Sequence, residues 1–220
     1  MPKVSQRRKA ALLFDLDGTL VDSKPGIVRC FRYALDELQK PSPSEDVLVA
    51  SIGQPFRPAF AGFLDTSDEH LIEQAVTLYR NRYGESGLYE ATIYEGVPDM
   101  LLALDNQTAY IATSKATVYA SRIIQHFGLA RYFRNVYGPD LNGKLGDKTE
   151  LVKHLLRTEQ ISGDAVMIGD RADDMLAAIN NGCRAVGVLW GYGSKAELAG
   201  AGAQVLCGTP TELAKYLLSM

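Results

Sequence analysis

The stretch AALLFDLDGT, residues 10–19, is the part of the chain from which the fold can be worked out. It opens with a run of apolar residues, Ala10 to Phe14, and then changes abruptly to acidic residues and a glycine. A β-strand that is buried on both faces of a parallel sheet has this continuous apolar character, whereas a half-exposed strand alternates between apolar and polar residues. The stretch therefore predicts a buried parallel strand that ends in charge.

From about residue 94 onward, strand-like and helix-like segments alternate. Further strands are expected near residues 109–113, 135–137, 165–169, 185–189 and 204–206. Helices are expected over residues 118–127, 148–157, 173–181 and 211–218. Strands that alternate with helices of this length form a parallel sheet with helices on both faces. The predicted fold class is α/β, a three-layer, Rossmann-like parallel sheet.

A helical insertion separates the first strand from this alternation. Between Pro25 and about Gly87 the apolar residues recur with helical spacing, and no strand pattern interrupts them. We therefore expect two units. One is an α/β core of residues 1–23 and 94–220, and the other is a helical unit of residues 24–93.

The composition excludes several classes of protein. The net charge is −3, and the longest apolar runs fall far short of the roughly 20 residues of a membrane-spanning helix. We therefore expect neither nucleic acid nor a membrane as a partner. The basic start at residues 3–9 is not followed by the apolar segment of a secretory signal. Three widely separated cysteines indicate buried free thiols, so we expect a cytoplasmic protein. We expect it to be a monomer or homodimer.

Reactive side chains follow the predicted strands, at the sheet edge where open parallel sheets bind ligands. The first strand ends in Asp15 and Asp17, which are expected to point the same way, and a later strand ends in Asp170. Carboxylates held together repel one another and are usually kept because a cation neutralises them. Such an all-oxygen ligand set suits Mg²⁺ with waters and a substrate phosphate. The second strand adds Thr113, and Lys148 begins a helix at the same edge.

Four motifs at these positions resemble the haloacid dehalogenase superfamily of phosphotransferases. The first is DxDGT at residues 15–19, the second is an apolar strand ending in Thr113, the third is Lys148, and the fourth is GDxxxD at residues 169–174. The helical insertion resembles the small α-helical cap of that superfamily, and we call residues 24–93 the cap. The segments most similar to the phosphoglycolate phosphatase subgroup are DGTLVDS (17–23), YEGV (94–97) and GDRADDMLAA (169–178).

The resemblance implies a chemical role for each motif. Asp15 would attack phosphorus and form an aspartyl phosphate. Asp17 would protonate the leaving oxygen and then take a proton from the attacking water. Thr113 and Lys148 would bind the phosphoryl oxygens.

The same resemblance implies how Mg²⁺ is held. Its ligands would be Asp15, Asp170 and the main-chain carbonyl of Asp17. Asp174 would support the metal site by orienting Lys148 or a metal-bound water. Asp173 is the alternative, but the common spacing of four residues after Asp170 favours Asp174.

Further residues are expected to contact the substrate, namely Gly18, Thr19, Ser114, Lys115 and Arg57. Thr113 and Ser114 are adjacent hydroxyls, and the family pattern favours Thr113 as the phosphoryl ligand. Arg57 lies in a predicted loop of the cap and either holds a substrate carboxylate or is a solvated surface residue. The segment Gly191-Tyr192-Gly193 either lines the entrance of the site or is a plain loop.

The predicted function is a Mg²⁺-dependent phosphatase for a small, phosphoglycolate-like phosphate monoester. A 5'-nucleotidase is an alternative, because Phe56, Phe60 and Phe63 either stack a base or form a core stripe of the cap. A sugar phosphomutase is less favoured. The mutases that resemble this chain carry a histidine soon after the first motif, and residues 22–27 hold none. A non-catalytic phospholigand-binding protein is the remaining alternative. The G-x4-G-K spacing at residues 138–144 does not indicate a P-loop, because Leu145 stands where a hydroxyl must bind Mg²⁺.

Overall fold

The structure is a computed structural model, and it describes residues 10–161 and 164–220. Six strands form one sheet in the order β5-β4-β1-β6-β7-β8, and all neighbouring strands are parallel. They are β1 (Ala11–Phe14), β4 (Ala109–Ala112), β5 (Val136–Tyr137), β6 (Ala165–Gly169), β7 (Arg184–Val188) and β8 (Val205–Cys207). Each lies within one residue of a predicted strand, so the predicted α/β fold is confirmed. The basic start of the sequence lies outside the described residues.

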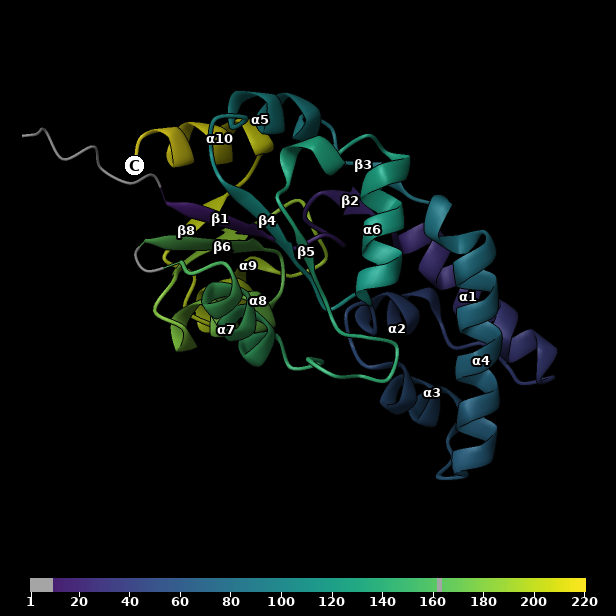
Figure 1. The fold of residues 1–220 in the computed structure, drawn as a ribbon. Helices are drawn as coiled ribbons and strands as arrows, with labels where there is room; N and C mark the ends of the chain where they lie inside the picture. The colour runs from purple at the N-terminus through teal and green to yellow at the C-terminus, as the bar shows by residue number, and fades with distance from the viewer. Residues whose placement is uncertain (1–9, 162–163) are drawn as a thin grey trace, which may run out of the picture.

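Helices cover both faces of this sheet (Figure 1). One face packs against α5 (Val97–Ala103), α6 (Thr117–His126) and α10 (Pro210–Leu218), and the other against α7 (Lys148–Thr158), α8 (Ala172–Asn180) and α9 (Lys195–Gly200). Successive strand residues point to opposite faces, so Leu12 and Phe14 of β1 are buried in the first cluster and Leu13 in the second. Helices α5 and α9 were not predicted, because helices of seven and six residues show too few turns for a clear period.

The insertion after the first strand is helical, as predicted. It comprises α1 (Lys24–Glu37), α2 (Glu45–Ala50), α3 (Phe56–Leu64), α4 (Glu69–Glu85) and a short 3-10 helix, η1 (Gly87–Tyr89). Figure 1 shows α1 to α4 together at one side of the sheet. The ring of Phe31 lies 5.5 Å from that of Phe60 and 5.2 Å from that of Phe63, between ring centroids. These phenylalanines therefore form the interior of the cap.

The two linkers between cap and core run side by side. Strands β2 (Val21–Asp22) and β3 (Thr92–Ile93) pair antiparallel, with Val21 opposite Ile93. Two-residue strands have no readable period, so the sequence did not predict them. Because the chain leaves and re-enters the core at this pair, we propose residues 1–23 and 94–220 as the core and 24–93 as the cap.

Two further expectations concern the chain as a whole. Among the described helices, none is both long enough and apolar enough to cross a membrane. Cys30, Cys183 and Cys207 are free and buried, as the sequence predicts.

Candidate active site

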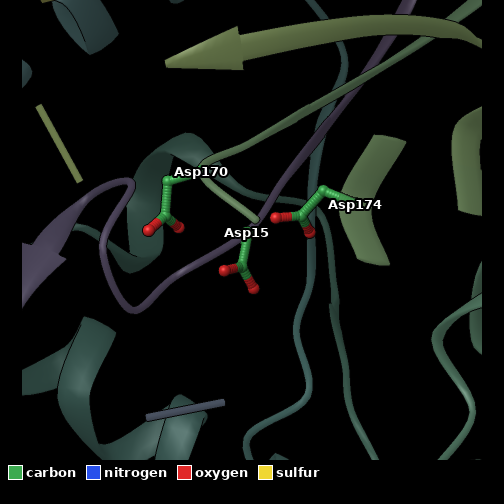
Figure 2. A group of neighbouring side chains, drawn as sticks. All are labelled: Asp15, Asp170 and Asp174. Atoms are coloured by element: carbon green, nitrogen blue, oxygen red, sulfur yellow. The ribbon is translucent and has the colours of Figure 1, made fainter. Parts of the chain in front are cut away.

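Three aspartates meet at the carboxyl edge of the sheet. They lie where the strands that follow β1 in the sequence change sides, because β4 and β5 lie on one side of β1 and β6 to β8 on the other. β1 and β6 are neighbours, and the amide of Asp15 donates to the carbonyl of Ile168 at 2.8 Å. Asp15 follows β1, Asp170 follows β6, and Asp174 lies in the first turn of α8 (Figure 2). All three carboxyl groups are buried. The topology thus brings together residues more than 150 positions apart, at the place where doubly wound sheets bind ligands.

We call Asp15, Asp170 and Asp174 the acidic cluster. Each offers one carboxylate oxygen, and these oxygens lie within 4.8 Å of one another. Burial, followed by the charges of Asp15 and Asp174, raises the pKa of Asp170 to about 8. Burial also raises the pKa of Asp174, to about 6, although Lys148 opposes the shift. A group of buried oxygen donors with excess negative charge fits a divalent cation such as Mg²⁺.

Lys148 provides positive charge inside the acidic cluster. It is the first residue of α7, which is capped by the Asp147 side chain, and its exposed fraction is 8%. Its ammonium lies 2.8 Å from Asp15 Oδ1 and also contacts Asp174. Burial lowers the pKa of this ammonium, but the two carboxylates outweigh burial and raise it, so Lys148 is charged. One ammonium does not balance the charge of three carboxylates, so a metal cation would complete the neutralisation of the cluster.

Asp17 binds a different lysine from Asp15. Its Oδ2 lies 2.8 Å from the ammonium of Lys115, and its Oδ1 accepts from the hydroxyl of Ser23. Lys115 also donates to the hydroxyl of Tyr83 in α4, at 2.6 Å. Although Asp15 and Asp17 are two residues apart, their side chains therefore have separate surroundings. Asp17 contacts Ser23, which directly follows β2, and it is linked through Lys115 to Tyr83 of the cap.

Gly18 and Thr19 lie against Asp170 and are not among the residues that line the cavity. Gly18 has a φ of +83°, and a Cβ there would overlap the Asp170 carboxyl group. This position therefore favours glycine both for its backbone and for the close approach of Asp170. The hydroxyl of Thr19 donates to Asp170 Oδ1 at 3.3 Å. Both predicted substrate contacts thus support the acidic cluster.

The hydroxyls after β4 lie at the same edge. Thr113 is buried, and its oxygen accepts from the amide of Lys115 at 3.2 Å. Ser114 is half-buried, and both residues line the cavity. Of the adjacent aspartates at the start of α8, Asp174 is buried beside Lys148 and Asp173 is exposed.

A cavity of about 920 Å³ lies between the core and the cap. Asp15, Asp17, Thr113 and Lys148 line its core side. Aromatic and aliphatic residues line its cap side, among them Ile52, Phe56, Tyr79 and Tyr83. Of the three cap phenylalanines considered as base-stacking residues, Phe56 lines the cavity, and Phe60 and Phe63 do not.

Arg57 also lines the cavity, but its guanidinium is engaged within the cap. It contacts the carboxylates of Glu69 and Glu73, and all three side chains are at least half exposed. Arg57 therefore lies at the cavity, and its charge is already paired with Glu69 and Glu73.

Sequence reasoning did not identify several residues that join core and cap at the site. They are Ser23, Tyr83 and Arg171. Arg171 contacts Glu197 of the core at 2.9 Å and the carbonyl of Ile52 in the cap at 3.2 Å. These contacts join residues distant in sequence, and no local motif marks them. The adjacency of Arg171 to the GDxxxD aspartate was the one available signal.

Comparison with known proteins places the chain in a family. The model of the haloacid dehalogenase-like hydrolase family matches residues 12–188, which is most of the chain. The protein therefore belongs to the haloacid dehalogenase-like hydrolase family, as the four motifs predict.

Particular relatives agree with this assignment. A 5'-nucleotidase of Pseudomonas aeruginosa is 42% identical over 193 residues, which cover 85% of this chain and 86% of the relative. A phosphoglycolate phosphatase of Vibrio parahaemolyticus is 26% identical over 220 residues, covering 96% of each chain. The crystal structure of a predicted phosphatase from Clostridium acetobutylicum has a TM-score of 0.89 at 34% identity and covers 96% of this chain and 99% of that one. The prediction of an enzyme of the phosphatase class is confirmed.

Proposed function

We propose that this enzyme hydrolyses small phosphate monoesters through an aspartyl phosphate at Asp15. The observation that carries the proposal is the position of this carboxylate. It lies at the wall of a cavity, 2.8 Å from the ammonium of Lys148 and beside the hydroxyls that follow β4. Lys148 lets an anionic nucleophile approach an anionic phosphoryl group, because its charge offsets their repulsion.

The reaction would take two displacements. In the first, an Asp15 oxygen bonds to phosphorus, the bond from phosphorus to the leaving oxygen breaks, and Asp17 gives that oxygen its proton. In the second, Asp17 takes a proton from a water whose oxygen attacks phosphorus, and the bond between phosphorus and Asp15 breaks. Phosphate leaves, and both aspartates return to their starting state. Thr113 and Lys148 would bind the phosphoryl oxygens throughout.

We also propose that Mg²⁺ is the cofactor. Asp15 and Asp170 would hold it with the main-chain carbonyl of Asp17, and Asp174 would support it by fixing Lys148. When bound, Mg²⁺ would neutralise part of the charge on the nucleophile and the phosphoryl group. The excess of buried carboxylates over ammonium groups supports this assignment.

Three observations favour a nucleoside monophosphate over a two-carbon phosphoacid as the substrate. The cavity of about 920 Å³ is within the range of roughly 300–1,000 Å³ that suits ligands of drug size. Arg57, the candidate ligand for a phosphoglycolate carboxylate, is already paired with Glu69 and Glu73. The half-buried ring of Phe56 offers an apolar surface for a base. The free buried thiols are typical of a reducing compartment, which supports the proposal of a cytoplasmic enzyme. We also propose that it is a monomer or homodimer.

Phosphate release tests both levels of the proposal. The panel contains nucleoside monophosphates, phosphoglycolate, sugar phosphates and an aryl phosphate, each with Mg²⁺ or chelator. We expect release that requires Mg²⁺, falls to background in Asp15→Asn and persists in Asp105→Asn, a matched change at an exposed loop residue. Full activity in Asp15→Asn would refute the covalent mechanism. A lack of release from every member would favour a phosphomutase or a binding protein.

A further inference from the structure

The loop that follows β7 packs tightly against the acidic cluster. A Cβ on Gly191 would overlap the carbonyl of Gly18 and the side chain of Asp170, and a Cβ on Gly193 would overlap the Asp170 carbonyl. The amide of Tyr192 donates to Asp170 Oδ2 at 2.7 Å. The indole of Trp190 donates to the carbonyl of Thr19 at 3.0 Å. These contacts hold the Tyr192 backbone in place beside Asp170.

The Tyr192 side chain reaches the linker where the cap begins. Its hydroxyl accepts from the amide of Ser23 at 2.9 Å and from the amide of Lys24 at 3.1 Å, and it donates to Asp22 Oδ1 at 3.0 Å. A hydroxyl has one proton and two lone pairs, so these contacts use its whole hydrogen-bonding capacity. Burial first, and the charge of Asp17 next, raise the pKa of Tyr192 above its ordinary value, so the hydroxyl keeps the proton that it donates.

Two amides at the start of α1 donate to the Tyr192 hydroxyl, and one of them, the amide of Lys24, also donates to Asp22 Oδ1 within the linker at 3.0 Å. Ser23 is the N-cap residue of α1, its hydroxyl donates to Asp17, and its side chain makes no capping hydrogen bond. The first amides of a helix have no partner within the helix and are usually satisfied by the N-cap side chain. The Tyr192 hydroxyl, which belongs to the core, accepts from two amides that an N-cap side chain does not serve, those of the N-cap residue Ser23 and of the first helical residue Lys24.

We propose that Tyr192 is a positioning residue that fixes the start of the cap relative to the acidic cluster. Its hydroxyl holds the linker, and its amide holds Asp170. The inference rests on the proposed phosphatase function, because it concerns how the cap is held over the cavity. Of the two roles expected for the Gly191-Tyr192-Gly193 segment, an entrance wall or a plain loop, the first agrees with the position of Tyr192, which lines the cavity.

A looser linker has a defined kinetic consequence. Two contacts of the cap with the core are those of Tyr83 with Lys115 and of the Ile52 carbonyl with Arg171, and Arg80 and Arg122 make further ones. If the linker is free to turn, a smaller fraction of molecules holds both contacts, and apparent substrate affinity falls in proportion to that fraction. Molecules with the cap in place react as before. The loss therefore falls on KM rather than on kcat.

The test compares Tyr192→Phe with Tyr110→Phe. The first variant removes the hydroxyl but keeps the ring and the amide that binds Asp170. The second removes the hydroxyl of another tyrosine of the core, which donates to Glu159 at 3.1 Å and is not in contact with the linker. We expect kcat/KM of Tyr192→Phe to fall about five- to tenfold, the scale of one net hydrogen bond, mainly through KM. Tyr110→Phe should keep the wild-type values.

Hydrogen exchange gives a second readout that needs no substrate. In Tyr192→Phe, the amides of residues 21–28 should exchange faster, while those of β6 keep their protection. Unchanged exchange at residues 21–28 would overturn the proposal, as would a loss confined to kcat or equal effects in both variants. If the wild-type enzyme releases no phosphate from any substrate, the proposed function fails, and the exchange result still decides the role of Tyr192.

Discussion

Replacing Lys148 by methionine gives a strong test of the electrostatics of the site. The ammonium is buried, lies 2.8 Å from Asp15 and contacts Asp174. Methionine keeps most of the length and apolar volume of lysine but removes the charge. The variant leaves three buried carboxylates without their cation, and this loss should appear in stability as well as in activity.

The structure sets the size of the effect. Removing one partner of a buried ion pair costs about 3–5 kcal/mol. In a domain of this size each kcal/mol shifts Tm by about 2–4 °C, so Tm of Lys148→Met in chelator should fall by roughly 6–20 °C. The fall should be larger at pH 8 than at pH 5, because the carboxylates repel one another only when they are ionised. Mg²⁺ should restore part of the loss, since it supplies the missing positive charge.

Thermal unfolding with and without Mg²⁺ measures these changes, and the same helix provides the control. Lys153 is exposed and paired with Glu150 at 3.2 Å, three residues away along α7. Such a pair contributes about 0.2–0.5 kcal/mol, so Lys153→Met should change Tm by about 2 °C or less. In the activity assay, Lys148→Met should lose at least about 100-fold in kcat, and Lys153→Met should lose little.

Two results would refute this reasoning. One is an equal Tm for the two variants in chelator, which would mean that the buried ammonium does not compensate the acidic cluster. The other is a failure of Mg²⁺ to raise Tm of Lys148→Met, which would mean that the carboxylates do not bind the metal.

Three more predictions follow from the site. Burial, and after it two neighbouring carboxylates, raises the pKa of Asp170 from 3.8 to about 8 in the folded protein. The folded state therefore keeps a proton that the unfolded chain loses, so this contribution to stability is complete below about pH 4 and disappears as pH rises through about 8. Tm in chelator should accordingly fall as pH rises from about 4 to 8. In Asp170→Asn, Tm should depend less on pH over this range. Gly18→Ala should weaken Mg²⁺ binding more than tenfold in a titration of Tm. Gly53→Ala should not, because Gly53 has a similar φ of +86° but open space around it. Thr113→Val should lower kcat by about 100-fold and Ser114→Ala by much less, and the reverse order in phosphate release would assign the phosphoryl contact to Ser114.

Much of the fold could be predicted because it depends on local patterns. The apolar run Ala11 to Phe14 is long enough for a buried strand and ends where the strand ends. The period of the cap helices is visible over several turns, as in α1 and α4. The pair β2 and β3 could not be found in this way, since each has two residues and depends on the other, 70 positions away, for its hydrogen bonds.

The residues of the candidate site also fall into two groups, those that local patterns predict and those that only packing decides. Asp15, Asp170 and Lys148 could be brought together from the sequence, because parallel strands all present their carboxyl ends at one edge. The partners of a flexible side chain follow no such rule. Arg57 pairs with Glu69 and Glu73, and this choice depends on how α3 packs against α4.

The sequence by itself determined the order of the elements, the acidic strand ends and the family to which the chain belongs. These features are encoded in the spacing of residues a few positions apart, which a strand or helix converts directly into position. The tertiary structure alone decided how the cap meets the core, through Lys115 with Tyr83 and Tyr192 with Lys24. Such contacts join residues 32 and 168 positions apart, and no local pattern encodes them, because the packing of the two units sets which side chains come within hydrogen-bonding distance.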